Sequence, residues 1–262
     1  MRVTILGSGA SSGTPSADSR GWGKCDPENP RNRRTRPSAL VETSDTRILI
    51  DTSPDLRQQL LRAGVNRLDA VVYTHAHADH LHGIDDLRAI NRTIDRPLNI
   101  HADAETLGII RRRFGYVFED LAEDATFYYK PTLIGNEIKA GNGFSIGRVE
   151  IMAIEQDHGY SRSLGFRFGP MGFTTDVVEM SEKAFEVLEG IDLWIVGALG
   201  DKPHPTHADV DKALGWIERI RPRRAVLSHL DIRLDYTELS KKMPPGVEVA
   251  YDGMELEVEG GG

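Results

Sequence analysis

The sequence predicts an α/β protein in which two packed β-sheets are covered by outer helices. Apolar, β-branched runs of strand length alternate in mixed order with helical runs, and this order favours two layers of sheet with helices outside them. Metal-capable residues come directly, or one residue, after four of the apolar runs: Asp51, His75, Asp176 and His229. Strand ends of this kind usually gather at one edge of a sheet, where loops build active sites.

Length and composition fit one domain of this class. The chain has 262 residues, of which 39% are hydrophobic and 27% are charged. These values allow one full core but not two independent domains, so we expect a single domain over residues 1–262. The net charge of −8 disfavours a surface for long nucleic acid, because that binding depends on many Lys and Arg contacts to phosphates. A small substrate is favoured instead.

The sequence also predicts a cytoplasmic protein. No apolar run approaches the ~20 residues that a membrane span needs, and the first residues, MRVTILGSG, enter a strand without a signal-peptide pattern. The one cysteine, Cys25, cannot form an intramolecular disulfide, which fits a reducing compartment.

The first 37 residues predict a strand followed by two loops. Residues 2–6 form the strand, and the Gly/Ser-rich residues 7–15 form a tight turn near the site. A phosphate-binding loop is the alternative, although the spacing fits neither the P-loop nor the dinucleotide fingerprint. Residues 16–37 are polar and carry four arginines: Arg31, Arg33, Arg34 and Arg36. We expect a solvated face there, with steering of a phosphate ester as the alternative.

The next elements lead to the central motif. Residues 39–43 and 47–50 predict a hairpin-like strand pair that ends at Asp51, and residues 54–63 predict a helix that Gly64 closes.

The segment VVYTHAHADHLHG, residues 71–83, places four metal-capable side chains after an apolar run. Residues 70–73 are typical of a buried strand. On extended backbone His75 and His77 leave the same face, so both imidazoles can reach one cation. Asp79 can start the following helix, where the turn directs Asp79 and His80 toward a second position. The segment therefore predicts a site for two metals.

The rest of the chain predicts alternating elements. Up to His158 these are a helix, a strand, a helix and three strands: 84–91, 98–102, 104–114, 126–130, 137–140 and 149–156. A strand pair over 164–168 and 172–175 leads to Asp176. The remaining elements are helix 182–188, strand 193–197, helix 207–220, strand 224–228, helix 236–242 and strands 247–251 and 254–258.

The HxHxDH motif and the residues that complete it downstream resemble the metallo-β-lactamase-fold hydrolase superfamily. Six phrases are similar to its branch of phosphoribosyl cyclic-phosphate phosphodiesterases: GSGASSGTP, PRNRRTRPSALVET, LIDTSPDLR, THAHADHLHGIDDLR, HPTHADVDKAL and LSHLD. The resemblance implies a four-layered αββα sandwich of two mixed β-sheets flanked by helices.

By motif position the resemblance also implies a ligand set for two divalent ions. One ion would take His75, His77 and His158; the other would take Asp79, His80 and His229, with Asp176 bridging both. Asp51 would support the site from behind. Histidine and carboxylate ligands without a thiolate leave manganese and zinc open.

The implied chemistry is phosphodiester hydrolysis by a metal-bridging hydroxide. The candidate catalytic residues are Asp79 and His207, and His207 matches the general acid that protonates the departing alkoxide. Helix capping or simple exposure is the alternative for His207. His204 could act in either way, His82 is expected in the pocket wall, and His101 is expected to be structural.

We therefore predict a dinuclear metal-dependent phosphodiesterase for a small cyclic or nucleotide-like phosphate ester, acting away from membranes. The alternatives are ribonuclease Z-like RNA cleavage, lactone, lactam or thioester hydrolysis, and a non-catalytic cofactor-biosynthesis protein; a homodimer is left open. The chain departs from the branch at its structural zinc, since only Cys25 remains of the cysteine cluster and Ile232 stands where a late histidine is expected.

Overall fold

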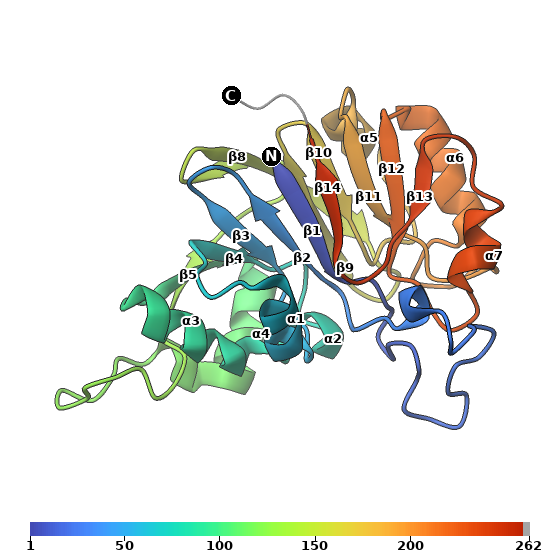
Figure 1. Ribbon diagram of the computed structural model, residues 1–262. Helices are drawn as coiled ribbons and strands as arrows, with labels where there is room; N and C mark the ends of the chain where they lie inside the picture. The colour runs from blue at the N-terminus through green and yellow to red at the C-terminus, as the bar shows by residue number, and fades with distance from the viewer. Residues whose placement is uncertain (259–262) are drawn as a thin grey trace.

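Two seven-stranded β-sheets form the centre of the molecule (Figure 1). The computed structural model describes residues 1–258. The first sheet has the order β14-β1-β2-β3-β4-β5-β6. Its strands are β1 (Arg2–Gly7), β2 (Ser38–Glu42), β3 (Arg47–Ile50), β4 (Ala70–Val72), β5 (Leu98–Ala102), β6 (Leu133–Glu137) and β14 (Met254–Glu257). The second sheet has the order β13-β12-β11-β10-β9-β8-β7. Its strands are β7 (Gly143–Ile146), β8 (Val149–Asp157), β9 (Arg162–Phe168), β10 (Met171–Thr174), β11 (Leu193–Gly197), β12 (Arg224–Ser228) and β13 (Val247–Val249).

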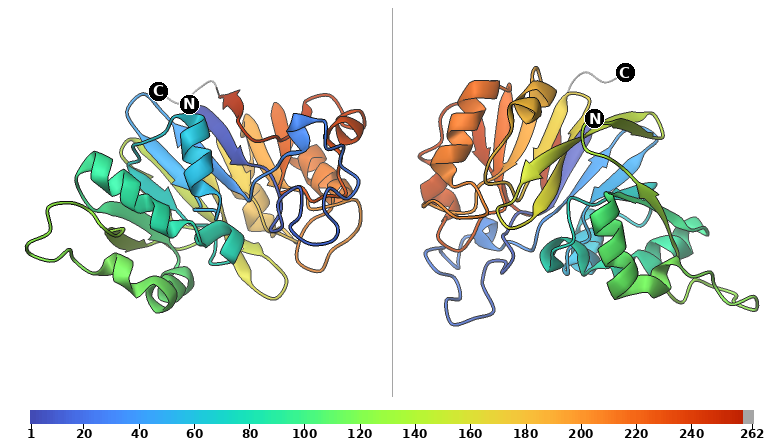
Figure 2. Two further views of the ribbon diagram at one scale, coloured as in Figure 1. Left: turned by 60° about the horizontal axis from the view of Figure 1, so that its bottom comes forward. Right: turned by 180° about the vertical axis from the view of Figure 1, so that it is seen from behind.

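Helices cover the outer faces of both sheets (Figure 2). The α-helices are α1 (Leu56–Ala63), α2 (Ala78–Leu81), α3 (Leu87–Ile94), α4 (Ala104–Phe114), α5 (Glu182–Leu188), α6 (Val210–Ile220) and α7 (Tyr236–Ser240). Three short 3-10 helices are η1 (Pro30–Asn32), η2 (Ile84–Asp86) and η3 (Gly115–Phe118). The strands supply apolar side chains to both faces, so three hydrophobic layers form. Val3 and Phe166 pack between the sheets, Tyr73 packs under α1, α3 and α4, and Trp194 packs under α5 and α6. The predicted αββα sandwich is confirmed.

The strand directions place several strand ends at one edge of the sandwich. In the first sheet β3, β4, β5 and β6 are parallel, and in the second β10, β11, β12 and β13 are parallel. The two sheets are tied together at this edge, where the Leu230 amide donates to the Ser8 carbonyl at 2.9 Å and the Ala10 amide donates to the Leu230 carbonyl at 3.0 Å. Residues that follow strands in different sheets therefore meet there.

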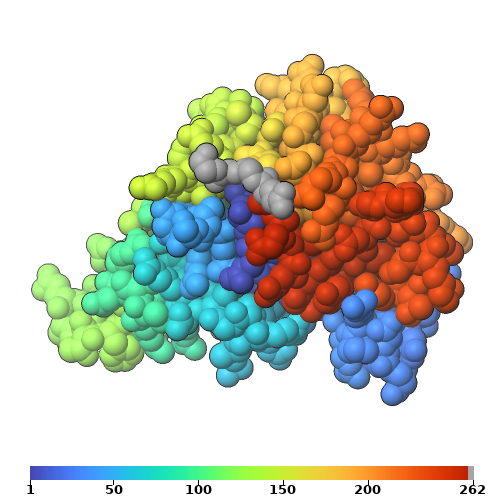
Figure 3. Space-filling view, turned by 45° about the horizontal axis from the view of Figure 1, so that its top comes forward, coloured from blue at the N-terminus to red at the C-terminus, as the bar shows by residue number. Residues whose placement is uncertain are grey.

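Two predicted elements were wrong. Residues 126–130 form no strand; they belong to an arm over residues 119–132, which projects from the body on the opposite side from the loop over residues 16–30 (Figure 3). Phe127 and Tyr129 on this arm are 58% and 43% exposed, since the aromatic run has no neighbouring strand to pair with. No strand spans residues 137–140: β6 ends at Glu137, and β7 begins at Gly143. The helix predicted over 207–220 is present as α6, but it begins at Val210 because the Asp209 side chain caps it by accepting from the Lys212 amide.

The other predicted elements occur within a few residues of their expected positions. Among residues 1–258 no helix is long and apolar enough to cross a membrane.

Candidate metal centre

The candidate site lies at the edge where the strand ends of both sheets meet. Asp51 follows β3, Asp176 comes shortly after β10, and His229 follows β12. All three have left-handed backbone, with φ of 60°, 52° and 59°. This conformation costs a non-glycine residue of order 1–3 kcal/mol and is found mainly where function constrains the chain. Here it turns the chain sharply at the strand end and directs each side chain into the edge.

Three histidines form the first group of metal-capable side chains. His75, His77 and His158 bring ligand atoms within 4.8 Å of one another. His158 Nε2 lies 3.3 Å from His77 Nδ1, and the other ring nitrogen of His158 lies 2.7 Å from the Thr206 carbonyl oxygen. Because a carbonyl oxygen can only accept, Nδ1 of His158 carries the proton and Nε2 offers a lone pair to the group.

A second group contains Asp79, His80 and His229, whose ligand atoms also lie within 4.8 Å of one another. His80 Nδ1 donates to the Asp51 carboxylate at 2.7 Å, which leaves His80 Nε2 facing the group. Thr74 holds Asp51 in turn, since its amide and hydroxyl donate to the two carboxylate oxygens at 2.8 and 2.7 Å. Asp51 therefore lies behind His80, as the resemblance implied.

Asp176 lies between the two groups. Its Oδ2 is 3.1 Å from His80 Nε2 and 3.3 Å from His229 Nε2. Its Oδ1 is 3.7 Å from His158 Nε2 and 2.9 Å from His207 Nε2. One carboxylate thus faces each group with a different oxygen, which is the arrangement that a bridging ligand requires.

Unpartnered nitrogens show that the donor set fits metal ions. Within residues 1–258, His75 Nε2, His80 Nε2 and His229 Nε2 are buried and have no hydrogen-bond partner. Buried polar atoms without protein partners are rare in folded proteins, and a cluster of them is typical of a ligand-binding site. Three nitrogens of this kind beside two carboxylates match the ligand chemistry of divalent transition metals.

The electrostatics of the two groups differ. Burial lowers the pKa of His75, His77 and His158, so these rings are neutral and ready to coordinate. Burial opposes protonation of His80 and His229 as well, but the nearby carboxylates, Asp176 above all, outweigh it and raise both pKa values.

The two acids of the centre stay ionised. Burial alone would raise the pKa of Asp79 and Asp176, but the imidazoles around them hold both pKa values far below the usual range. A metal entering the second group must therefore displace protons from histidine, whereas the carboxylates are already available as ligands.

His207 lies in the loop before α6 and completes a further group with His158 and Asp176. Its Nε2 faces Asp176, and its Nδ1 lies 2.7 Å from the Thr206 hydroxyl. The helix-capping alternative for His207 is wrong, because Asp209 caps α6. His204 lies beside His207, with ring centroids 5.2 Å apart.

The other two histidines lie outside the ligand groups. His82 is exposed and packs edge-on against Phe114 of α4, with ring centroids 5.5 Å apart. His101 lies within β5, where it stacks on Phe144 at 5.4 Å.

Sequence reasoning missed two threonines and an arginine at this edge. Thr74 and Thr206 position histidines through the bonds described above, and they lie in the segments THAHADHLHGIDDLR and HPTHADVDKAL. Arg113 Nη1 donates to the Ala76 carbonyl at 3.1 Å and thereby fixes the backbone between His75 and His77. Arg113 is 37 residues from Ala76 in the sequence, so no local motif connects the two residues.

The loop that would carry a structural zinc is held by other contacts. The buried Arg34 guanidinium donates to the Asp231 and Leu234 carbonyls at 3.2 and 2.7 Å, so it ties the loop to the segment after His229. Cys25 is buried beside Arg34, with Sγ 3.8 Å from its Nη1.

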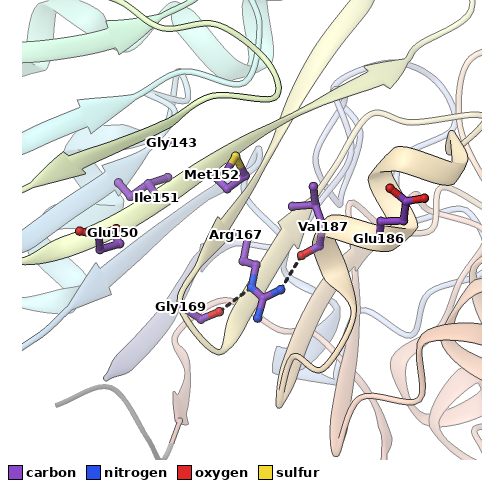
Figure 4. Close-up of a pocket in the computed structure, with 8 residues that line it drawn as sticks. All are labelled: Gly143, Glu150, Ile151, Met152, Arg167, Gly169, Glu186 and Val187. Carbon is purple, nitrogen blue, oxygen red and sulfur yellow. Dashed lines mark hydrogen bonds between the residues drawn. The ribbon is translucent and has the colours of Figure 1, made fainter.

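A surface groove of about 340 Å³ lies between β7, β8, β9 and α5, away from these histidines (Figure 4). Arg167 inside it donates to the Gly169 and Val187 carbonyls at 2.8 and 2.6 Å. The groove gathers no metal-capable cluster, so we assign it no part in the chemistry.

The chain is similar to known proteins over most of its length. Residues 46–230 match the family model described as the beta-lactamase superfamily domain. The octanoyltransferase of Porphyromonas gingivalis (strain ATCC BAA-308 / W83) is 36% identical over 99% of this chain, and the chain spans 52% of that relative. The chain thus spans about half the length of this curated relative.

Two solved structures are similar over nearly the whole chain. A new diphosphatase from the PhnP family has a TM-score of 0.87 and 30% identity, covering 98% of this chain and 97% of its own. Zn²⁺-bound PqqB from Methylobacterium extorquens has a TM-score of 0.76 and 19% identity, covering 98% and 100%, a likeness of fold alone.

Proposed function

Because the chain belongs to the β-lactamase superfamily, whose metal-dependent hydrolase fold it has, we propose that it is a dinuclear phosphodiesterase for a small cyclic or nucleotide-like phosphodiester. The observation that carries the proposal is the position of Asp176, which offers one oxygen to each of two adjoining histidine groups. The proposed ligands are His75, His77 and His158 for one ion and Asp79, His80 and His229 for the other, with Asp176 shared. Two divalent ions bound there, manganese or zinc, would acidify a water molecule and offset charge on phosphate oxygens.

The charge of the donor set favours an anionic substrate. Five neutral imidazoles and two carboxylates, Asp79 and Asp176, do not cancel the charge of two divalent cations. A phosphodiester monoanion suits such a centre better than a neutral lactam or lactone. The similarity to a diphosphatase supports phosphate chemistry.

The surface favours a small substrate over tRNA. The arm over residues 119–132 is not basic; four of its exposed side chains are acidic, namely Glu119, Asp120, Glu123 and Asp124. With a net charge of −8, the protein lacks the excess of cations on which RNA binding depends.

His207 is the proposed general acid. When water attacks phosphorus and the ester P–O bond breaks, the departing alkoxide needs a proton, which His207 Nε2 can donate. The Thr206 hydroxyl at Nδ1 and Asp176 at Nε2 orient the ring toward the centre. A placed imidazolium typically contributes ~10²–10⁴-fold to such a step. Asp79, whose pKa the neighbouring His80 and His229 hold low, stays ionised and would serve as a ligand of the second ion.

A substrate panel on metal-quantified protein tests the proposal. The panel contains bis(p-nitrophenyl) phosphate, a 2′,3′-cyclic nucleotide, a phosphomonoester, a lactam and an octanoyl thioester. We expect two metals per chain and fastest turnover of a phosphodiester, and the Asp176→Ala variant should lose both metal and turnover. Two bound metals with turnover of the lactam or thioester alone would refute phosphodiester hydrolysis while leaving the hydrolase fold intact.

Thioester hydrolysis is the second candidate, favoured by the octanoyltransferase relative. In that reaction water adds to the acyl carbon and the thiolate leaves with a proton. Nearly half of that relative has no counterpart in this chain. The proposal of phosphodiester hydrolysis therefore follows the charge of the donor set rather than the name of that relative.

A further inference from the structure

The turn between β8 and β9 carries an aromatic side chain that no part of the fold covers. Tyr160 is 90% exposed, more than any other large hydrophobic side chain of residues 1–258, where Leu61 follows at 66%. Single exposed aromatic side chains are common on protein surfaces, so exposure alone has no functional meaning. The place of Tyr160 is what distinguishes it, because it comes two residues after the candidate ligand His158.

The turn is a tight hairpin loop of two residues. β8 and β9 pair as far as the turn, and the His158 amide donates to the Ser161 carbonyl at 3.1 Å, so only Gly159 and Tyr160 lie outside the ladder. Gly159 has a φ of +72°, the positive value that the first position of the favoured hairpin turns requires. Since consecutive Cα atoms are 3.8 Å apart, Tyr160 Cα lies within ~7.6 Å of His158 Cα.

The turn is tied to two other segments of the candidate metal centre. The Asp157 carbonyl accepts from the Val178 amide at 2.8 Å, just after Asp176 in the chain. A Cβ at Gly159 would lie 2.6 Å from the Pro205 carbonyl oxygen, so the turn packs directly on the loop before α6 that carries the candidate general acid. These contacts fix the backbone of the turn at the rim of the centre, with the tyrosine ring on it.

The surroundings of Tyr160 suit a small planar group better than a protein surface. The other exposed large hydrophobic side chains of residues 1–258 lie on α1, on β6 and on the arm over residues 119–132. On the hairpin itself Arg162 and Glu155 form an exposed ion pair at 2.9 Å. A protein partner needs a wider apolar patch than one ring. One fixed ring is instead sufficient to stack on a nucleobase, whose two faces are apolar.

We propose that Tyr160 is a stacking platform for the base of a nucleotide substrate whose phosphate lies at the metal centre. This inference rests on the proposed function, because the metal centre would hold the phosphodiester. It adds that the preferred substrate is a nucleotide and not the cyclic phosphate of a sugar without a base. Tyr160 would contact the base and not the reacting atoms, so it sets specificity and takes no part in bond breaking.

Equilibrium binding separates the contribution of the base from that of the phosphate. The metal-loaded wild type and three variants, Tyr160→Ala, Tyr160→Phe and Tyr129→Ala, are titrated by calorimetry with two ligands. These are adenosine 5′-monophosphate and methyl β-ribofuranoside 5-phosphate, in which a methoxy group replaces adenine. Tyr129→Ala is the control, since Tyr129 is another exposed tyrosine, 43% exposed on the arm. Wild type and Tyr129→Ala should prefer the adenine ligand by ~10- to 100-fold, as for one stacked base.

Tyr160→Ala should lose this preference by binding the adenine ligand more weakly, while keeping its metals. Tyr160→Phe, which retains the ring without the hydroxyl, should keep the preference. Equal affinity of wild type for both ligands, or an undiminished preference in Tyr160→Ala, would overturn the platform. Loss of metal from Tyr160→Ala would overturn it as well, because the residue would then support the metal centre.

Steady-state kinetics give a second readout. Tyr160→Ala should lower kcat/KM for adenosine 2′,3′-cyclic monophosphate relative to glycerol 1,2-cyclic phosphate by the same factor, through KM and not through kcat. A fall in kcat on both substrates would contradict the platform. Preference for the adenine ligand without phosphodiester hydrolysis would refute only the proposed function, whereas hydrolysis without the preference would refute only the platform.

Discussion

Replacing Asp51 with Asn should weaken metal binding without touching a ligand. Oδ1 of Asp51 accepts from the Thr74 amide, a donor that the backbone fixes, so the new amide nitrogen cannot take that place. It must take the place of Oδ2, which accepts from His80 Nδ1 at 2.7 Å. The asparagine would then donate to His80 Nδ1 and move the ring proton to Nε2, the nitrogen that faces the metal centre.

A histidine with its proton on Nε2 cannot coordinate through that atom. Loss of such an orienting carboxylate typically costs 10- to 100-fold in metal affinity, about 1.4–2.7 kcal/mol. Competition with a chromophoric chelator should show this loss for one of the two metals, with the other changed much less. Asp252→Asn is the matched control: the Asp252 side chain is 4% exposed and accepts from the amides of Ser8 and Thr35 and from Arg62, but it holds no histidine.

Asp252→Asn should lower the melting temperature of the metal-free protein while leaving both metal affinities near wild type. Unchanged metal affinity in Asp51→Asn, or equal losses in the two variants, would refute the argument that Asp51 acts by setting the tautomer of His80.

Further predictions follow from the same geometry. Asp176→Ala should release both metals, because one carboxylate faces both groups, and retention of either ion at full affinity would contradict its bridging role. His207→Ala should keep both metals but lose kcat steeply on alkyl esters and little on p-nitrophenyl esters, whose leaving group departs without a proton; equal losses would exclude it as the acid. Metal uptake should release protons, because the carboxylates around His80 and His229 raise the pKa of both and so favour their protonated forms without metal. Metal affinity should thus rise with pH, and calorimetry in buffers of different ionisation enthalpy should detect those protons. Cys25→Ser should be tolerated, since Arg34 supplies the stronger tie there, and loss of a tightly bound metal on that change would reveal a zinc site.

The sequence was most informative about the candidate site where metal-capable residues directly follow a strand. Asp51, His75, Asp176 and His229 could be expected at one edge because strand ends in a packed sheet share that edge. The HxHxDH spacing likewise predicted two adjoining groups, since alternation on extended backbone separates His75 and His77 from the pair on the following helix.

Other features depend on contacts that no local pattern records. The aromatic run Phe127–Tyr129 has high strand propensity, but it lies on an arm without a partner strand, so propensity alone misled the prediction. Arg34 and Arg36 are separated by one residue in the same polar segment, and only the fold buries the first and pairs the second with Asp55. The role of Thr206, whose carbonyl accepts from His158 across 48 residues, required the two loops to be seen together.

The most direct test of the account is the anomalous-scattering map of a crystal of the metal-loaded protein, collected at the manganese and zinc edges. We expect two ions per chain, one bound by His75, His77 and His158, the other bound by Asp79, His80 and His229, with one oxygen of Asp176 on each. A single ion, or a pair of ions that Asp176 does not share, would contradict it.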